Sequence, residues 1–289
     1  MQIQHQMTHY QDVSGWELSD SFWERSKPFL PKPKSRFRGR GKKRKNVGGR
    51  PPADSRKVLS GILFVLRTGC QWNAAPKERY GSGKTLHRYF QVWSRRGVFK
   101  RMWKAGLAEY DEVTGIDWKW QAADGAMTKA PLGGDLTGPN PTDRGKSGTK
   151  RSLLVDGKGV PLSIVVGPAQ RADSKLLAPT LENIVIVQPE SSEQAPQNLC
   201  LDKAYTGQPT QETGAKHGYK IHVPDKVNAK QKRKRKPGRR KARRWVVEVT
   251  HSWLNRFRRL QIRWEKKRGN YLSLLYFACA IICWRKCEV

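Results

Sequence analysis

The predicted order of strands and helices after Ile116 is the feature that most constrains the fold of this chain. Between Thr149 and Ala169, two apolar strands flank the turn Asp156-Gly157-Lys158-Gly159, a pattern typical of a hairpin. An alternating strand precedes the hairpin, and a helix, a short buried strand, another helix and a last strand follow it. This order predicts an α/β sheet domain.

Three acidic residues occupy suggestive positions in this domain. Asp124 falls near the end of the first strand, Asp202 at the C-terminal end of the short buried strand, and Glu248 on a helix that begins near Arg243. Functional side chains of open α/β sheets meet at strand ends. If the two strands are neighbours, their carboxylates converge, and a helix laid across the sheet adds Glu248. Three carboxylates leave coordination positions for water and phosphate oxygens, as Mg²⁺ prefers.

The surroundings of these acids are strongly basic. The chain carries 57 Lys and Arg against 24 Asp and Glu, a formal net charge of +33, which is typical of proteins that bind phosphate-rich partners. A carboxylate repels phosphate, and a bound divalent cation lets the two groups share one site. Two such ions would activate an attacking hydroxyl and stabilise the leaving oxygen of an in-line displacement.

Cysteine usage and hydropathy favour a cytoplasmic protein with no membrane span. The five cysteines are scattered and odd in number, which argues against a disulfide framework. The last three recur every fourth residue, which predicts small buried side chains on one helical face rather than a zinc site. The N-terminus is polar, so no signal peptide is expected, and the apolar run Leu272–Trp284 predicts a buried helix too short to span a membrane.

The first 112 residues are predicted to form an all-helical DNA-binding domain, with a basic Pro- and Gly-rich linker at about 31–52. An apolar stripe predicts a helix that is followed by Gly69, and a polar helix is expected from about Gly83 to Arg96. A helix, a glycine-containing turn and a polar helix resemble a helix-turn-helix module. The alternative is an ordinary helical bundle with a basic surface. The predicted DNA-contact residues of the polar helix are Lys84, His87 and Arg88.

The GSGKT segment at the start of the polar helix does not complete a nucleotide-binding loop. A glycine is needed five residues before Gly83, and Glu78 stands there. The sequence therefore gives no basis for ATP binding.

The C-terminal part, 113–289, contains a basic insertion at about 225–244 and then the Glu248 helix. Glu248 has a second interpretation as the ion-pair partner of Arg244, four residues earlier. Asp156 is interpreted as a turn residue. Asp173 is interpreted as a helix cap, with a supporting role at the acidic site as the alternative. The stripe expected to be buried in the Glu248 helix comprises Val246, Val249, Trp253, Phe257 and Leu260.

Seven segments, in this order, resemble the DDE transposases of bacterial insertion sequences, and most closely the group called insertion-sequence family five. The likeness extends from about Leu18 to Lys286. Related transposases carry a Tyr-Arg-Glu-Lys signature around the glutamate. Arg244 fits the Arg place, but Lys241 and Asn255 stand at the Tyr and Lys places, so those two roles are not carried over. The segments are LSDSFWERSKPFLP, GRPPADSRKVLSGILFVLRTGCQW, TLHRYFQVWSRRGVF, DGAMTKAP, GTKRSLLVDGKGVPLSIVVGPAQRADSKLL, LDKAYTG and RRWVVEVTHSWLNRFRRLQIRWEK.

The resemblance implies a ribonuclease-H-like core, a mixed sheet with flanking helices, and a triad of metal ligands, Asp124, Asp202 and Glu248. It implies Mg²⁺ as the cofactor, with Mn²⁺ able to substitute. The expected activity is cleavage of DNA at terminal inverted repeats and joining of the 3′ ends to target DNA. A homodimer acting on double-stranded DNA at the bacterial nucleoid is also expected. Additional candidates for phosphate contact are Arg244, Arg256 and Arg259.

Two other functions compete with this one. The first is a catalytically inactive, transposase-derived DNA-binding protein, which the intact acidic triad argues against. The second is a basic RNA-binding or ribosomal protein, which does not need acids at strand ends.

Overall fold

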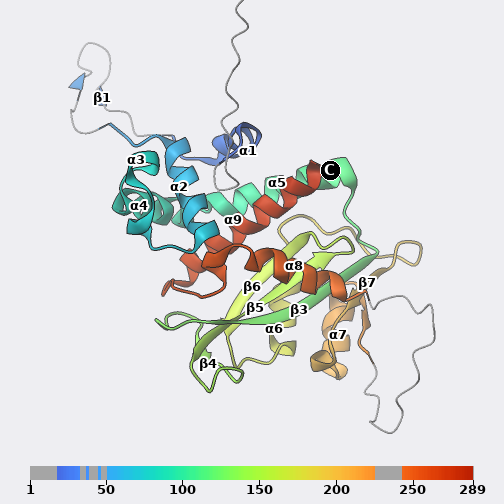
Figure 1. Cartoon of the computed structure of the whole chain (residues 1–289). Coiled ribbons are helices and arrows are strands. Elements are labelled where there is room, and N and C mark those ends of the chain that lie inside the picture. The colour runs from blue at the N-terminus through green and yellow to red at the C-terminus, as the bar shows by residue number, and fades with distance from the viewer. Residues whose placement is uncertain (1–17, 33–36, 39–44, 47–50, 225–242, 289) are drawn as a thin grey trace, which may run out of the picture. The chain divides into compact units, whose positions relative to one another are not determined.

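The structure, a computed structural model, describes residues 18–32, 37–38, 45–46, 51–224 and 243–288. The chain divides into two compact units, Met1–Trp93 and Ser94–Val289. The first contains mainly helices, and the second is built on a six-stranded sheet (Figure 1). Of the basic insertion predicted at 225–244, residues 225–242 lie outside the described residues.

The first unit is helical, as predicted, with one exception in the segment predicted to be a linker. There, β1 (Phe37–Arg38) pairs with β2 (Lys45–Asn46) in an antiparallel ladder. The basic linker predicted at about 31–52 therefore includes a short pair of strands, since backbone pairing needs no apolar side chains. The helices are α1 (Asp20–Ser26), η1 (Lys27–Phe29), α2 (Ser55–Thr68), η3 (Trp72–Ala74), α3 (Lys77–Tyr80) and α4 (Gly83–Arg95).

Helix α2 begins and ends where its sequence indicates. The carboxylate of Asp54 accepts hydrogen bonds from the backbone N–H groups of Arg56 and Lys57, which caps the helix. Gly69 ends it in the left-handed conformation, with φ 74°. Helix α2 also needs a glycine at position 61, where it packs closely against α4. A Cβ at Gly61 would lie 2.8 Å from the side chain of Leu86.

Helix α5 (Val98–Thr114) packs against α9 (Arg268–Cys287), so it belongs to the second unit and not to the N-terminal one as predicted. The rings of Phe99 and Phe277 have centroids 5.1 Å apart, and those of Trp103 and Tyr276 stack at 5.5 Å. The boundary therefore lies at Trp93 rather than at residue 112. The apolar stripe of α5 predicts that one face is buried but carries no information about its partner.

The second unit contains a mixed sheet with the order β4-β5-β3-β7-β8, in which β6 also pairs with β5. Strand β5 runs antiparallel to β3 and β6, while β3, β7 and β8 are parallel. The predicted fold, a ribonuclease-H-like mixed sheet with flanking helices, is confirmed. The strands are β3 (Trp120–Lys129), β4 (Gly138–Pro139), β5 (Ser147–Asp156), β6 (Pro161–Pro168), β7 (Gln197–Cys200) and β8 (Tyr219–His222).

Helices α6 (Ser174–Glu182) and α8 (Trp245–Asn255) cover opposite faces of the sheet (Figure 1). Arg151 of β5 donates a hydrogen bond to Asn255 of α8, whereas the next residue, Ser152, is 2.8 Å from the hydroxyl of Thr180 on α6. Successive side chains of a strand point to opposite faces. Each catalytic candidate can therefore be assigned to the α6 face or the α8 face. The third flanking helix, α7 (Gln208–Lys216), precedes β8.

The hairpin turn between β5 and β6 is stabilised by Asp156, which is fully buried. Its carboxylate accepts hydrogen bonds from the backbone N–H groups of Lys158, at 2.9 Å, and Val160, at 2.8 Å. The hydroxyl of Tyr110 on α5 donates to the other oxygen at 3.2 Å. The interpretation of Asp156 as a turn residue is confirmed.

The predicted buried stripe of α8 is partly wrong. Val246 is buried as expected, but Val249 and Trp253 are only half-buried. The helix ends at Asn255, so Phe257 and Leu260 are buried without belonging to it, and Leu260 lies in the 3-10 turn η6 (Arg258–Leu260). The buried residues of α8 are Val246, Val247, Thr250, His251 and Leu254.

Helix α9 confirms the predicted buried C-terminal helix. Cys279 and Cys283 are buried in it, and Cys287 is half-buried. None of the helices in the described ranges is long and apolar enough to cross a membrane.

Candidate active site

Parallel pairing of β3 with β7 brings Asp124 and Asp202 to the same level of the sheet. The last pair in their register is Ala122 with Cys200, and each aspartate lies two residues beyond it. Asp202 continues in an extended conformation, with φ −80° and ψ 169°. By alternation, both carboxylates leave the sheet on the side of Ala122 and Cys200. Asp124 lies in the middle of β3 rather than near its end as predicted, but β7 ends beside it and leaves the edge of β3 open.

Helix α8 adds Glu248 to this site through one arginine. The guanidinium of Arg244 lies 3.3 Å from Oδ2 of Asp124 and 2.7 Å from Oε1 of Glu248. Asp124 is largely buried, with 22% of its side chain exposed, whereas Glu248 is 54% exposed. Asp124 and Glu248, two of the three carboxylates predicted to bind metal, are therefore close enough to share one cationic group. The ion-pair interpretation of Glu248 is confirmed, and its role as a metal ligand stays a prediction.

Burial dominates the electrostatics of Asp124. Desolvation raises the pKa of its carboxyl above the ordinary value, and the negative charges of Asp202 and Asp173 add to this effect. The backbone N–H of Gly125, which donates to Oδ1 at 2.8 Å, and the guanidinium of Arg244 lower the same pKa. The site thus holds several negative charges in partly buried surroundings, and it needs cations to stabilise them.

Asp173 lies at this site and not only at the start of α6. It occupies the N-cap position, but its side chain caps no backbone N–H group, so the interpretation as a helix cap is wrong for its side chain. Its Oδ2 instead accepts from the ammonium of Lys150, at 3.1 Å, and Lys150 also donates to the carbonyl of Arg171 at 2.8 Å. Sequence reasoning missed Lys150, although a lysine within an apolar strand is a signal that could have indicated a buried partner.

The chemistry of the donor set fits a divalent cation. Carboxylate oxygens are the ligands that Mg²⁺ prefers, and the guanidinium of Arg244 already places one cation between two of the three predicted ligands. Within the described ranges, no group of three or more His, Cys, Asp or Glu side chains is arranged closely enough to hold a metal ion. With Arg244 in this position, the triad is not drawn together around one point.

His251 lies beside the backbone of Asp124. It is buried on α8, and desolvation, together with the positive charge of Arg151, lowers its pKa to about 3. The imidazole is therefore neutral at physiological pH.

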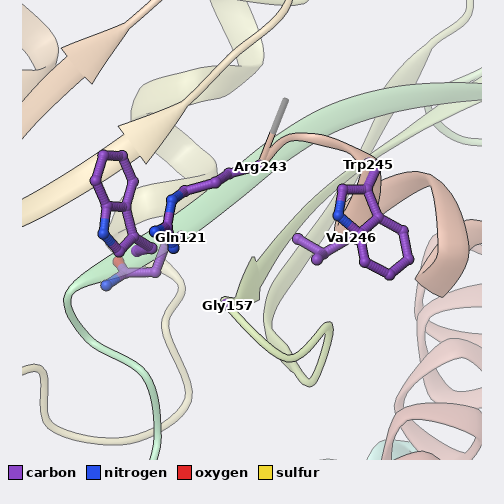
Figure 2. A pocket seen from close by; sticks show the side chains of 6 residues that line it. Gln121, Gly157, Arg243, Trp245 and Val246 are labelled. Carbon is purple, nitrogen blue, oxygen red and sulfur yellow. The ribbon is translucent and has the colours of Figure 1, made fainter. Parts of the chain in front are cut away.

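A small pocket adjoins the start of α8 (Figure 2). The guanidinium of Arg243 stacks 4.2 Å from the centroid of the Trp120 ring, and the indole of Trp245 is 48% exposed. Arg243 and Trp245 precede Glu248 by a few positions, and sequence reasoning missed both of them and Trp120. The remaining lining residues are Gln121, Gly157 and Val246.

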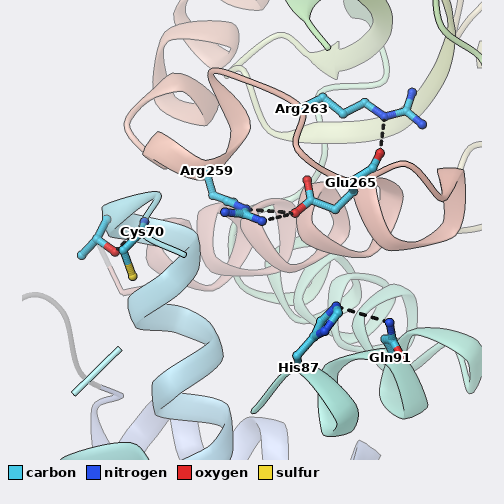
Figure 3. A network of polar contacts seen from close by, with 7 residues as sticks. Cys70, His87, Gln91, Arg259, Arg263 and Glu265 are labelled. Atoms are coloured by element: carbon cyan, nitrogen blue, oxygen red, sulfur yellow. Dashed lines mark hydrogen bonds and ion pairs between the residues drawn. The ribbon is translucent and has the colours of Figure 1, made fainter. Parts of the chain in front are cut away.

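The predicted DNA-contact residues of α4 have different environments. Lys84 and Arg88 are exposed, and the Arg88 guanidinium lies 5.2 Å from the Tyr89 ring centroid. His87 is half-buried, stacks on Trp72 at 5.1 Å and contacts Gln91 at 3.3 Å (Figure 3). Lys84 and Arg88 are therefore the more accessible candidates.

The two arginines that follow α8 also differ. Arg256 is exposed, but Arg259 is 6% exposed and donates through Nε and Nη2 to Oε1 of Glu265, at 2.9 and 2.7 Å. Figure 3 shows this pair beside Arg263, which donates to the backbone carbonyl of Glu265. This placement does not support the phosphate contact predicted for Arg259, because the guanidinium is occupied inside the protein.

Two family models match the chain. Residues 18–103 match "Putative transposase of IS4/5 family". Residues 121–283, more than half of the chain, match "Transposase DDE domain". The second match includes β3 and α8, and so it contains all three acids of the predicted triad.

Two similar proteins come from Burkholderia cepacia. One is the putative transposase for insertion sequence element IS402, 33% identical over 150 residues that cover 51% of this chain and 68% of that protein. The other is the insertion element IS402 uncharacterized 16.2 kDa protein, 35% identical over 125 residues that cover 43% of this chain and 80% of that protein.

Solved structures with some likeness include the Mos1 strand transfer complex and a pre-cleavage Mos1 transpososome. They are 8% and 10% identical, each comparison covers 84% of this chain and 81% of that chain, and the TM-score is 0.26 in both. A likeness of this size supports no inference about the chain. The family match and the IS402 relatives do, and they show that this chain belongs to the DDE transposases of bacterial insertion sequences.

Proposed function

We propose that the protein binds the terminal inverted repeats of its insertion sequence, cleaves DNA there and joins the freed 3′ ends to target DNA. The observation that carries this proposal is the Arg244 bridge, which holds Asp124 and Glu248 within reach of one cation beside Asp202. Mg²⁺, or Mn²⁺ in its place, would supply the activation of the attacking hydroxyl and the stabilisation of the leaving oxygen.

The roles of the chain's own residues follow from their positions. Asp124 and Asp202 project from neighbouring parallel strands, so the sheet fixes the separation of their carboxylates. Glu248 is exposed on α8 and can adjust to a ligand without moving the helix. Arg244 is half-buried between the carboxylates in the protein without DNA. We propose that its guanidinium contacts a DNA phosphate when metal takes its place between them.

Recognition of the repeat is assigned to α4. Lys84 and Arg88 project from the exposed side of this helix, while Leu86, Phe90 and Trp93 are buried. A helix whose apolar side is fixed in a core can present basic side chains to the major groove of DNA in a defined register. His87 and the exposed Arg256 are kept as additional contact candidates. Arg259 is not, because Glu265 pairs with it.

Two ends must be processed together, so the active form is proposed to be a homodimer on double-stranded DNA, associated with the bacterial nucleoid. The alternative is a catalytically inactive descendant that binds DNA. The retained acids argue against it, because an exposed Glu248 and a partly buried Asp124 serve no purpose in binding an anionic backbone.

A strand-cleavage assay separates these functions. The substrate is a labelled duplex that carries the end of the element with its flanking DNA, incubated with the full-length chain and either Mg²⁺ or EDTA. The proposal expects a nick with a free 3′-hydroxyl at the element end in Mg²⁺ and none in EDTA. Binding to the end without cleavage in Mg²⁺ would favour the inactive descendant. Equal binding to scrambled DNA and to RNA, without cleavage, would favour a general nucleic-acid-binding protein.

A further inference from the structure

The carboxylate of Asp173 has one oxygen that the fold leaves without a partner. Oδ2 accepts from Lys150, but Oδ1 is buried and has no hydrogen-bond partner within the described part of the chain. The ion pair with Lys150 therefore explains only half of this side chain. A buried carboxylate oxygen without a partner is costly to stability, so a native protein that retains one requires an explanation.

The sequence beside Asp124 makes room for this oxygen. A Cβ at Gly125 would overlap Oδ1 of Asp173, so no other residue type fits at position 125 unless Asp173 moves. Gly125 is part of a regular strand and has no left-handed backbone that would require glycine. The close approach of Asp173 is thus the reason for glycine at this position, and it fixes Oδ1 against the backbone of β3.

Asp173 approaches β3 from the face opposite Asp124. Gly125 pairs with Ser152, which faces α6, whereas Asp124 pairs with Leu153 on the α8 face. Strand β7 ends at Cys200, so in the described part of the chain this edge of β3 is open from Asp124 to Thr128, before Lys129 bridges to Ile262. A cation at this open edge is accessible to carboxylates from both faces of the sheet.

The charges around Tyr205 support this arrangement. Burial raises the pKa of its hydroxyl, and the negative charges of Asp173, Asp124 and Asp202 all raise it further. All three carboxylates are therefore close enough to this one buried hydroxyl to act on it electrostatically. Like charges in partly buried surroundings repel one another, and ion pairs with Lys150 and Arg244 offset the charges of Asp173 and Asp124.

We propose that Asp173 is a fourth carboxylate of the divalent-metal site, with Oδ1 as its free ligand atom and Lys150 as the residue that orients it. This inference rests on the proposed function, because it assumes that Asp124 and Asp202 bind metal. Gly125 belongs to the same arrangement, because the absence of a side chain at this position leaves space for Oδ1 of Asp173 beside β3.

Metal binding by the full-length protein without DNA tests this proposal directly. Mn²⁺ is the probe, and the signal of free Mn²⁺ in electron paramagnetic resonance gives its affinity without any activity measurement. Asp173→Asn is expected to weaken Mn²⁺ binding by about tenfold or more, as is typical when a residue of a metal site is removed. Asp173→Ser should do the same, and serine at an N-cap position keeps the start of α6 intact if the asparagine variant folds poorly.

Two control variants separate a metal-site role from a structural one. Asp143 is a matched aspartate, 21% exposed and paired with Lys129 at 3.4 Å, and Asp143→Asn should bind Mn²⁺ like the wild type. Lys150→Gln removes the orienting ion pair but keeps the Asp173 carboxylate as a ligand, so its loss of Mn²⁺ affinity should be clearly smaller than that of Asp173→Asn. Loss of affinity in Lys150→Gln equal to that in Asp173→Asn would show that only the ion pair matters, and would overturn the proposal.

The remaining outcomes distinguish this inference from the proposed function. If Asp124→Asn weakens Mn²⁺ binding and Asp173→Asn does not, Asp173 is outside the site and only this inference fails. If the wild type binds no Mn²⁺, the metal-dependent function fails together with it. Thermal unfolding of each variant without metal shows whether it is folded in the assay.

Discussion

The guanidinium of Arg244 lies 2.7 Å from the carboxylate of Glu248, one turn away on α8, and the same guanidinium contacts Asp124 of β3 at 3.3 Å. A helix and a strand that are 120 positions apart in the chain are thus joined by one cation. This contact places α8 over the strand that carries Asp124. Asp124 and Glu248 are two of the three carboxylates proposed to bind metal, so on that proposal the arginine and the metal compete.

Replacing Arg244 should tighten metal binding in the absence of DNA. The Arg244→Gln variant removes the competing guanidinium and leaves both carboxylates in place. Mn²⁺ affinity should rise about two- to fivefold, which corresponds to about 0.3–1 kcal/mol for a partly exposed ion pair. Calorimetric titration of the full-length protein measures it. Arg256→Gln, at the exposed end of the same helix, should leave the affinity unchanged. Weaker binding by Arg244→Gln would mean that the arginine orients the carboxylates.

Asp124→Asn should stabilise the protein at neutral pH. Burial is the main cause that raises the pKa of Asp124 above its ordinary value of 3.8. A carboxyl with a raised pKa in the folded state contributes stability that is complete below the unfolded value and is lost as the pH rises through the folded value. Asparagine carries no charge, so the variant avoids this loss.

Urea unfolding in EDTA, at a series of pH values from 7 downward, tests this dependence. The free energy of unfolding of Asp124→Asn should exceed that of the wild type at pH 7, and the difference should shrink as the pH approaches 3.8. Asp143→Asn controls for the loss of a carboxylate elsewhere. A difference that grows at low pH would contradict the assignment of burial as the dominant influence.

Arg259 should contribute to the stability of the folded protein rather than to DNA binding. Arg259→Met leaves Glu265 as an unpaired buried charge, which costs about 3–5 kcal/mol. The double variant Arg259→Met/Glu265→Met should recover most of this loss, since neither charge then remains in the interior. Urea unfolding measures both, and Arg258→Met, at the exposed neighbouring arginine, should change little. An unchanged stability of Arg259→Met with a loss of DNA affinity would restore the phosphate-contact role predicted from the sequence.

Lys84 and Arg88 should distinguish the element end from other DNA. In the full-length chain, Arg88→Ala should weaken binding to the terminal repeat by about 1–3 kcal/mol if it contacts a base edge. Lys84→Ala should also weaken binding to the terminal repeat. Lys104→Ala, an exposed lysine of α5, serves as the control. Gel shift measures the affinities. Equal losses of affinity for the terminal and scrambled duplexes would show that both residues contact only phosphates.

The sequence predicted the second unit well because its signals are local. Alternation and the Asp-Gly turn define the hairpin, and the carboxylate of Asp156 acts within its own turn. The caps of α2 at Asp54 and Gly69 are likewise decided within a few residues. Such features need no knowledge of distant contacts, so the residue pattern is sufficient to predict them.

Features that depend on distant contacts could not be predicted from the sequence. The stripe of α5 indicates a buried face, but its partner α9 lies far along the chain, and the domain boundary was misplaced for that reason. In the candidate site, too, residues with local signals were predicted and contacts between distant elements were not. Asp124, Asp202 and Glu248 were predicted from their positions and the family resemblance, whereas Asp173 was interpreted as a helix cap because its partner Lys150 comes from another element.

The central claim is that Asp124, Asp202 and Glu248 act as metal-binding residues in DNA cleavage. The most direct test measures the Mg²⁺-dependent rate of end cleavage for Asp124→Asn, Asp202→Asn and Glu248→Gln, together with their affinity for the same end. We predict that each variant loses activity by about a thousandfold or more, the equivalent of the several kcal/mol that a bound metal supplies, while end binding stays close to that of the wild type. Asp143→Asn should cleave normally. A wild-type cleavage rate in any one of the three variants would contradict the account.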